Sequence, residues 1–415
     1  MALIAAIALL GLQGSIYKQV VPMPTGKNGY EQLVQAVDIL QASRFSTYEP
    51  MIASLTAPEE PTPESAQAWQ ELAKRTYLQR VRLVTDRNSR VRELVLDAVK
   101  RPIFDPRSKA DFDTLFPELA GFRGIARFIK LDLYRAFADG QHDAAMDLAI
   151  AGLDAFDQSA RGILIEYLVG LACHAIVFSA IEEQLPQFSQ RDATRLEQAV
   201  LSLLQRKPAV RDAIEIEFRV STMGLDKALS QTRSAEELVK MLGDDDKSKA
   251  LKLLKTMSEA DLIRVREGVK TRFAELGRQI VARFDGDEAA WAASEDEEPP
   301  MRDWSSVNGL VGAIADSLVP VFAQVGRTAA VRSTQLRLLA IAASVVRFRW
   351  EHNRLPASVE EAVGPARALD PLAKEKFEIR RSPDGWAIIS KGTKQTGEVT
   401  LRYRRPSGAD GPGPP

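Results

Sequence analysis

The alternation of apolar and polar positions predicts helices over most of the chain. Apolar residues recur at intervals of three and four, which is the spacing of one helix face. The most regular block lies between residues 115 and 206. There a first helix ends at Asp139-Gly140, a second spans His142–Phe156, a third spans Ile163–Gln184, and a fourth begins at Ser189. We therefore predict a multi-helix bundle built from helical hairpins.

Serine followed three residues later by an acid marks further helix starts, because the two side chains cap each other's backbone. This spacing occurs at Ser189 and Asp192, at Ser234 and Glu237, and at Ser258 and Asp261. The turn at 140–145 resembles that of a tetratricopeptide unit. No second copy follows at a fixed spacing, so we predict tetratricopeptide-like hairpins without a solenoid array.

The last hundred residues change from helical to strand periodicity. A long helical pattern covers Val325–Trp350 and stops at Asn353–Pro356. Strand patterns follow at Phe377–Ser382, Trp386–Ser390 and Glu398–Arg404, the first two joined through Asp384-Gly385. Because an isolated small sheet needs an apolar surface to pack on, the long helix is its expected support. The sequence predicts a mainly α fold with a small C-terminal α+β module, a long helix and a three-stranded antiparallel sheet.

Breaks in these patterns divide the chain into four segments. We expect residues 1–22 to form a hydrophobic signal or anchor, because Ala2–Leu12 is uninterruptedly apolar; a buried first helix is the alternative. Residues 23–298 form an all-α body, in which Thr47–Pro63 is expected to be a loop. Residues 299–405 contain the long helix and sheet, after an acidic, proline-terminated break. Residues 406–415, rich in glycine and proline, are expected to form a disordered tail.

Charge and cysteine content exclude some partners and cross-links. The 55 lysines and arginines nearly balance 56 aspartates and glutamates, so no net field attracts nucleic acid. Cys173 is the single cysteine, which rules out an intrachain disulfide.

The sequence contains no complete match to a known catalytic motif. His142, His174 and His352 stand in no metal-ligand spacing, and no phosphate-binding glycine loop or Gly-x-Ser-x-Gly elbow occurs. Ser15 and Lys18 fit Ser-x-x-Lys without its companion motifs, and the acidic runs 244–246 and 285–288 do not match a calcium loop. We assign no catalytic residue, no cofactor and no metal.

Glu166 and His174 are the polar candidates for the interior. They lie eight residues apart in an otherwise apolar helix, which favours a buried bundle helix over a membrane span. A buried carboxylate needs a partner, and we expect Glu166 to pair with an arginine such as Arg135, Arg332 or Arg337. The alternative is a general acid with a raised pKa.

Several segments together resemble uncharacterised membrane-anchored bacterial envelope proteins: the apolar start, the Asp139-Gly140 hairpin, Glu166–Gly170 and the closing Asn353–Pro356. The C-terminal segment resembles the globular part of type II secretion pseudopilins, in which a helix leads through a turn and an Asp-Pro to a terminal sheet. Asn353 stands where those proteins have glycine, and residues 390–394 are basic where they often carry an aspartate-rich calcium loop. The resemblance implies a fold and a compartment.

The leading expectation is a non-enzymatic scaffold or adaptor in an envelope or secretion assembly. It is anchored in the inner membrane by its N-terminal segment, with the body outside the cytoplasm and unidentified protein partners. Two alternatives stay open: a helical groove that binds a peptide or small ligand, and an enzyme of unrecognised type that uses buried carboxylates.

Overall fold

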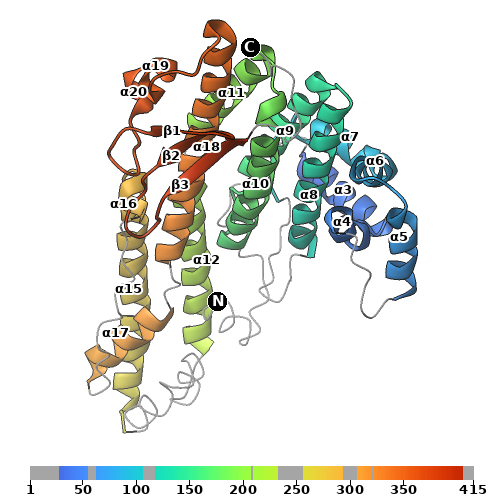
Figure 1. The fold of residues 1–415 in the computed structure, drawn as a ribbon. Helices are drawn as coiled ribbons and strands as arrows, with labels where there is room; N and C mark the ends of the chain where they lie inside the picture. Colours follow the sequence, from blue (N-terminus) through green and yellow to red (C-terminus); the bar gives the residue numbers. More distant parts are fainter. Residues whose placement is uncertain are drawn as a thin grey trace.

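The computed structural model describes residues 28–54, 62–105, 117–206, 209–231, 256–292, 306–318 and 322–404. Helices dominate these ranges, and one three-stranded antiparallel sheet lies near the C-terminus (Figure 1). The predicted mainly α fold with a C-terminal α+β module is confirmed. Three predictions lie outside the described residues: the N-terminal anchor, the boundary at 298 and the disordered tail.

The N-terminal layer stands at one side of the molecule (Figure 1). It consists of α3 (Tyr30–Ala42), α4 (Phe45–Ala53), α5 (Pro63–Ala73), α6 (Tyr77–Arg87) and α7 (Ser89–Ala98). The predicted loop over Thr47–Pro63 is wrong for residues 47–53, which belong to α4. Pro50 lies inside that helix, and the buried side chains of Phe45, Tyr48 and Ile52 hold it against the bundle despite the missing backbone donor.

The central layer contains the helices whose bounds the sequence predicted most accurately. They are α8 (Pro117–Ala138), α9 (His142–Ser159), α10 (Leu164–Gln184), the 3-10 turn η1 (Leu185–Gln187) and α11 (Gln190–Leu204). Gly140 between α8 and α9 has φ 69°, a conformation that glycine adopts without steric cost. The capping box at Ser189 and Asp192 is present.

A third group of helices extends past the others. It comprises α12 (Ala209–Gln231), α15 (Glu259–Arg283), α16 (Glu288–Ala292), α17 (Val307–Leu318) and the first half of α18 (Phe322–His352). Ser258 and Asp261 cap α15 as predicted. The predicted cap at Ser234 lies outside the described residues.

The C-terminal module packs on the second half of α18. After α19 (Val359–Val363) and α20 (Pro365–Ala368) come β1 (Glu378–Ser382), β2 (Gly385–Ser390) and β3 (Val399–Arg404), in the order β1-β2-β3. Asn353 ends α18 with φ 51°, a left-handed conformation that asparagine tolerates better than most residues. The Asp370 carboxylate, 1% exposed, accepts hydrogen bonds from Leu372 N at 2.9 Å and Ser390 Oγ, which pins the end of β2.

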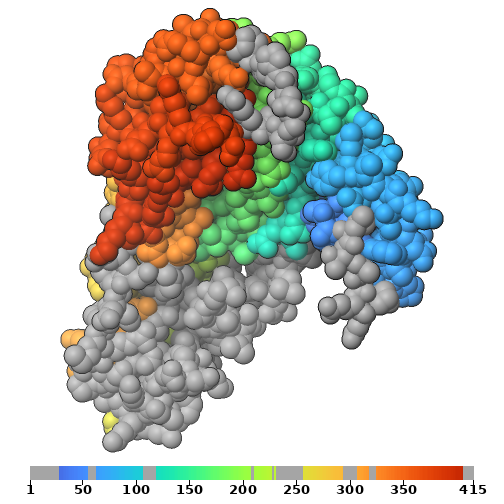
Figure 2. Space-filling view, in the orientation of Figure 1, coloured from blue at the N-terminus to red at the C-terminus, as the bar shows by residue number. Residues whose placement is uncertain are grey.

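The inner face of the sheet rests on α18 and α10. Ile379, Ile388 and Leu401 form one cross-strand row of that face, and the Trp386 and Tyr403 rings stack at 4.9 Å in the next. The Tyr403 hydroxyl accepts a hydrogen bond from Arg349 Nη1 of α18 at 3.0 Å. The module forms one face of the molecule, away from α3 to α7 (Figure 2).

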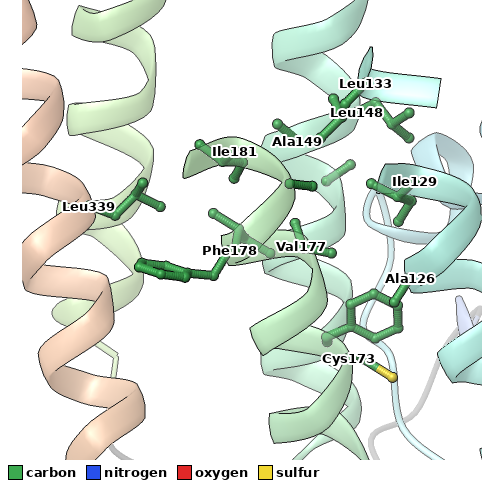
Figure 3. Packing of buried hydrophobic residues seen from close by; sticks show 14 of the residues in the cluster. Ala126, Ile129, Leu133, Leu148, Ala149, Cys173, Val177, Phe178, Ile181 and Leu339 are labelled. Carbon is green, nitrogen blue, oxygen red and sulfur yellow. The ribbon is translucent and has the colours of Figure 1, made fainter. Parts of the chain in front are cut away.

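Buried apolar residues form two main cores, and α18 belongs to both. The body core combines residues of α3 to α11 with the sheet and with Leu336 to Val346 of α18. The arm core combines residues of α12, α15 and α17 with Val325 and Ala329 of α18 and part of α10. Figure 3 shows Phe178 and Ile181 of α10 beside Leu339 of α18, with Val177 and Cys173 toward the helices on the other side.

Two described helical segments, 164–187 and 324–352, are long and apolar enough to cross a membrane by length and composition. In both, most residues of the apolar stretch are buried inside the protein, 67% and 72% respectively. Core helices of a helical bundle have the same length and apolar composition. Both segments are core helices in this fold.

Two glycines of α8 face α3 at different separations and provide a matched test. A Cβ on Gly121 would lie 2.3 Å from Val37 Cγ1, whereas a Cβ on Gly124 would lie 3.6 Å from Leu40 Cδ1. Gly121→Ala should lower the free energy of unfolding by about 1–3 kcal/mol, because the stiff, buried valine cannot turn away. Gly124→Ala should raise it by up to about 1 kcal/mol through helix propensity. Urea unfolding measures both; equal effects would contradict the close α3–α8 contact.

Candidate functional site

A small polar cavity lies where the two cores meet, between α9, α10, the start of α12, α16 and α18. Its volume is about 60 Å³, room for a few water molecules or one small ion. Its polar and aromatic lining residues are Asp157, Arg161, Tyr167, His174, Arg206, Glu288, Trp291, Arg332, Ser333 and Arg337. Two helical layers therefore contribute charged groups to one enclosed space.

Asp157 of α9 is the centre of the charged network and is 4% exposed. Its carboxylate accepts hydrogen bonds from Arg161 Nη2 at 3.2 Å, from Arg206 Nη1 at 3.4 Å and from Arg332 Nη2. Burial alone would raise the pKa of Asp157, but the charges of Arg332 and Arg161 outweigh it and hold the pKa below its usual value. Asp157 is therefore ionised at neutral pH.

Glu288 of α16 forms the second ionic group of the cavity. Its Oε1 accepts from Arg337 Nη2 and from Ser333 Oγ, each at 2.8 Å. Burial opposes ionisation here too, yet Arg337 and Ser333 keep the pKa of Glu288 lowered. Two carboxylates and four guanidiniums line the cavity. Asp154 lies outside the lining, and its Oδ1 accepts a hydrogen bond from Arg206 Nη1 at 2.5 Å.

His174 of α10 lines the same cavity and is 1% exposed. Neither its Nδ1 nor its Nε2 has a hydrogen-bond partner among the described residues. Burial, together with the charge of Arg332, lowers the pKa of His174 to about 3. The imidazole is therefore neutral, with one ring nitrogen able to donate a hydrogen bond and the other able to accept one.

The lowered pKa of His174 predicts a pH dependence of stability. The unfolded chain binds a proton near pH 6.5 that the folded chain rejects until about pH 3. Stabilisation is therefore complete above pH 6.5 and is lost as the pH falls, by about 1.4 kcal/mol per unit. Relative to His174→Gln, wild type should lose about 2 kcal/mol between pH 6.5 and pH 5 in chemical unfolding. A constant difference between the two proteins would contradict a neutral, buried His174.

Glu166 is buried as well, at 3% exposure, but does not line the cavity. It stands in the first turn of α10, where its Oε2 accepts from the Ile163 backbone N–H at 2.8 Å. The arginines proposed as its partners bind other carboxylates: Arg135 binds Asp132, Arg332 binds Asp157 and Arg337 binds Glu288. An arginine partner for Glu166 stays a prediction.

Asp157 and Glu288 were not predicted from the sequence. Asp157 lies near the end of α9 and forms an i, i+4 pair with Arg161 just past the helix. This pattern marks a buried ion pair only when the facing helix also carries a cation. Glu288 belongs to the acidic run 285–288, which the sequence excludes only as a calcium loop. Its neighbours lie on the surface, where Asp285 pairs with Arg211 and Asp287 with Lys374.

The described residues contain no group of three metal-ligating side chains. His142 hydrogen-bonds Asp192 at 2.8 Å, His174 lines the cavity, and His352 contacts the Phe348 carbonyl oxygen at 3.0 Å. Ser15, Lys18 and the acidic run 244–246 lie outside the described ranges. Cys173 is buried, and burial raises the pKa of its thiol to about 12, so it is unreactive.

The open hollows of the described surface include two of similar volume. One, of about 680 Å³, follows the groove between α12 and α15 and includes Phe218 and Met223. The other, of about 690 Å³, lies at the outer side of the terminal sheet and includes Arg380, Arg402 and Arg404. Both have the volume of ligand or peptide sites.

The fold and cavity define a mainly α protein in which a buried charged cluster joins two helical cores and a small sheet closes one face. No protein family, no characterised protein and no solved structure matches this chain. The site is therefore interpreted from its own geometry.

Proposed function

We propose that the protein is a non-enzymatic, membrane-anchored envelope protein that acts as a scaffold or adaptor in an envelope or secretion assembly. Its N-terminal segment anchors it in the inner membrane, and its body lies outside the cytoplasm. The observation that carries the proposal is the way the helical body holds the terminal sheet, with the outer edge of β1 unpaired among the described strands.

The two edges of the sheet differ. At β3, the Arg402 backbone N–H donates to Glu182 Oε1 of α10 at 2.6 Å, so a side chain of the bundle covers this edge. At β1, no described strand pairs with the outer edge, and Arg380, Arg381 and Ser382 are exposed. An exposed edge strand accepts a strand of another chain, and its charged residues discourage unselective pairing. Such a surface suits a protein partner.

The pseudopilin resemblance supports the same assignment. The helix, the turn at Asn353, the Asp370-Pro371 step and the antiparallel sheet follow one another in the order expected of that module. Proteins of that kind work by contacting other proteins in an envelope assembly. The enclosed cavity, at about 60 Å³, holds only a few waters or a small ion and does not require an enzymatic role.

Cell fractionation tests the compartment. The chain with its native N-terminus is expressed in a bacterial host, and protease is added to spheroplasts. We expect the protein in the membrane fraction and its body digested from outside. Soluble protein in the cytoplasm would overturn the anchored envelope assignment.

Photo-cross-linking tests the docking surface. A photo-reactive residue replaces Arg380 on β1 or, as the control, Glu93 on α7; both side chains are 61% exposed. We expect a discrete cross-linked product from position 380 that position 93 does not give. Identical products at both positions, or none at 380, would contradict a partner at the terminal sheet.

A further inference from the structure

The outer face of the terminal sheet carries aligned arginines. The strand register places Arg380 of β1, Ala387 of β2 and Arg402 of β3 in one cross-strand row. Successive side chains of a strand point to opposite faces, so this row faces away from the helices that support the neighbouring row through Ile388. Two strand spacings separate the arginine Cα atoms by about 10 Å. The small side chain of Ala387 therefore forms the floor of a trough with a guanidinium on each side.

The next outward row extends the trough toward the hairpin turn. It contains Ser382, Gly385 and Arg404, with the glycine in the middle. The hollow of about 690 Å³ at the outer side of the sheet is lined by both rows. Its three outward arginines are all exposed. Open space above two small residues is thus bordered by three guanidiniums.

The contacts of Arg380 with carboxylates are long. Its Nη2 lies 4.0 Å from Glu378 Oε2 and 3.8 Å from Glu398 Oε2. Glu378 has a closer partner in Lys391, at 3.2 Å. Exposed pairs at the limit of ion-pair distance contribute little. The Arg380 guanidinium therefore remains able to bind a carboxylate of another molecule.

Arg402 and Arg404 form no ion pair with any described residue. Their charges act on Glu182 of α10, whose Oε1 accepts from the Arg402 backbone N–H at 2.6 Å. Burial raises the pKa of Glu182, and that hydrogen bond and the two arginine charges only partly offset the increase. A guanidinium has five N–H donors. Both arginines on β3 thus have donors for a partner.

We propose that the trough binds an acidic extended segment of a partner protein, with its carboxylates between Arg380 on one side and Arg402 and Arg404 on the other. The inference rests on the proposed adaptor function, because it names the chemistry of the partner at the terminal sheet. Guanidiniums bind carboxylates through paired, directional hydrogen bonds. The chain has a formal net charge of -1, which gives no overall field for nucleic acid, so recognition is local.

The spacing of the two rows defines the expected pattern of the segment. Alternate residues of an extended chain are about 7 Å apart, and the same distance separates residues 380 and 382 along β1. A segment that runs along the strands with an acid at every second position therefore places one carboxylate in each row.

Fluorescence anisotropy of the full chain in non-ionic detergent tests the site. The probes are a labelled decapeptide of alternating glutamate and threonine, its lysine-threonine counterpart, and a labelled thymidine strand of equal length. We expect saturable binding of the acidic peptide, at least about tenfold tighter than the basic one and weakened by salt. Equal affinity for the two peptides would overturn the proposal. So would a thymidine strand that binds as tightly as the acidic peptide.

A matched pair of double variants tests the arginines. Arg402→Gln with Arg404→Gln removes two guanidiniums from the trough and should weaken binding of the acidic peptide at least about tenfold. Arg90→Gln with Arg264→Gln removes the same charge at exposed positions on α7 and α15, and it should change the affinity less than about twofold. Equal weakening in the two proteins would show that binding follows net charge, and the proposal would fail.

A third variant changes the shape of the trough without changing its charge. Ala387→Tyr fills the floor with a side chain that strands accommodate well, and it should weaken binding of the acidic peptide at least about tenfold. An unchanged affinity would exclude the trough as the site. Circular dichroism verifies folding of every variant.

The adaptor function and the acidic partner fail in different experiments. A cross-link from position 380 together with no binding of the acidic peptide would overturn the acidic partner alone. Soluble cytoplasmic protein that still binds the peptide would overturn the envelope assignment alone.

Discussion

Replacing Asp132 by alanine is expected to lower the free energy of unfolding by about 3–5 kcal/mol. Asp132 of α8 has a fully buried side chain and binds two arginines. Arg92 Nη2 of α7 donates to Oδ1 at 2.6 Å, and Arg135 Nε donates to Oδ1 at 2.8 Å. Without this carboxylate two guanidiniums at the α7–α8 contact lose their main counter-charge, and Arg135 is only 8% exposed.

Glu93→Ala is the matched control, because Glu93 belongs to an exposed pair with Arg90 on α7. Exposed pairs contribute little, so this variant should change stability by less than about 0.5–1 kcal/mol. Urea unfolding of the three proteins at pH 7 measures the difference. If Asp132→Ala and Glu93→Ala lower the free energy of unfolding by similar amounts, burial does not determine how much the Asp132 ion pairs stabilise the fold.

Replacing Leu339 by alanine should cost about 2–5 kcal/mol. Leu339 has no exposed surface, and it lies on α18 across from Phe178 of α10 (Figure 3). Truncation removes buried methyl groups and leaves a cavity at a contact between two long helices, which cannot close without moving one of them.

Leu369→Ala, the same chemical change at a side chain that is 52% exposed, controls for the loss of a leucine as such. It should shift stability by no more than about 0.5 kcal/mol. Thermal or urea unfolding measures both variants. A loss below about 1 kcal/mol in Leu339→Ala would contradict tight packing between α10 and α18.

The sequence predicted those elements whose signals are local. The capping boxes at Ser189 and Ser258, the helix end before Gly140 and the hairpin at Gly385 each depend on a few neighbouring residues. Helix α4 could not be predicted in this way. Proline and small polar residues suggested a loop there, and burial of Tyr48 and Ile52 against distant helices decided otherwise.

The candidate site was accessible from sequence only in part. His174 was singled out because a polar residue in an apolar helix is conspicuous. Arg332 and Arg337 do reach the interior, and the carboxylates they bind there, Asp157 and Glu288, were not among the sequence candidates. Which acid meets which arginine depends on how the helices are placed, and α9 precedes α16 and α18 by more than a hundred residues.

The passage of α18 through both cores has a consequence for how the protein unfolds. Ala329 belongs to the arm core and Leu339 to the body core, and both lie on one continuous helix. Unfolding of α18 in one core therefore disrupts its packing in the other core as well. The backbone amides at the centre of α18 should therefore exchange with deuterium only through opening of the whole molecule, as in a single cooperative unit. The protein would then melt as one piece, although its helices occupy two regions.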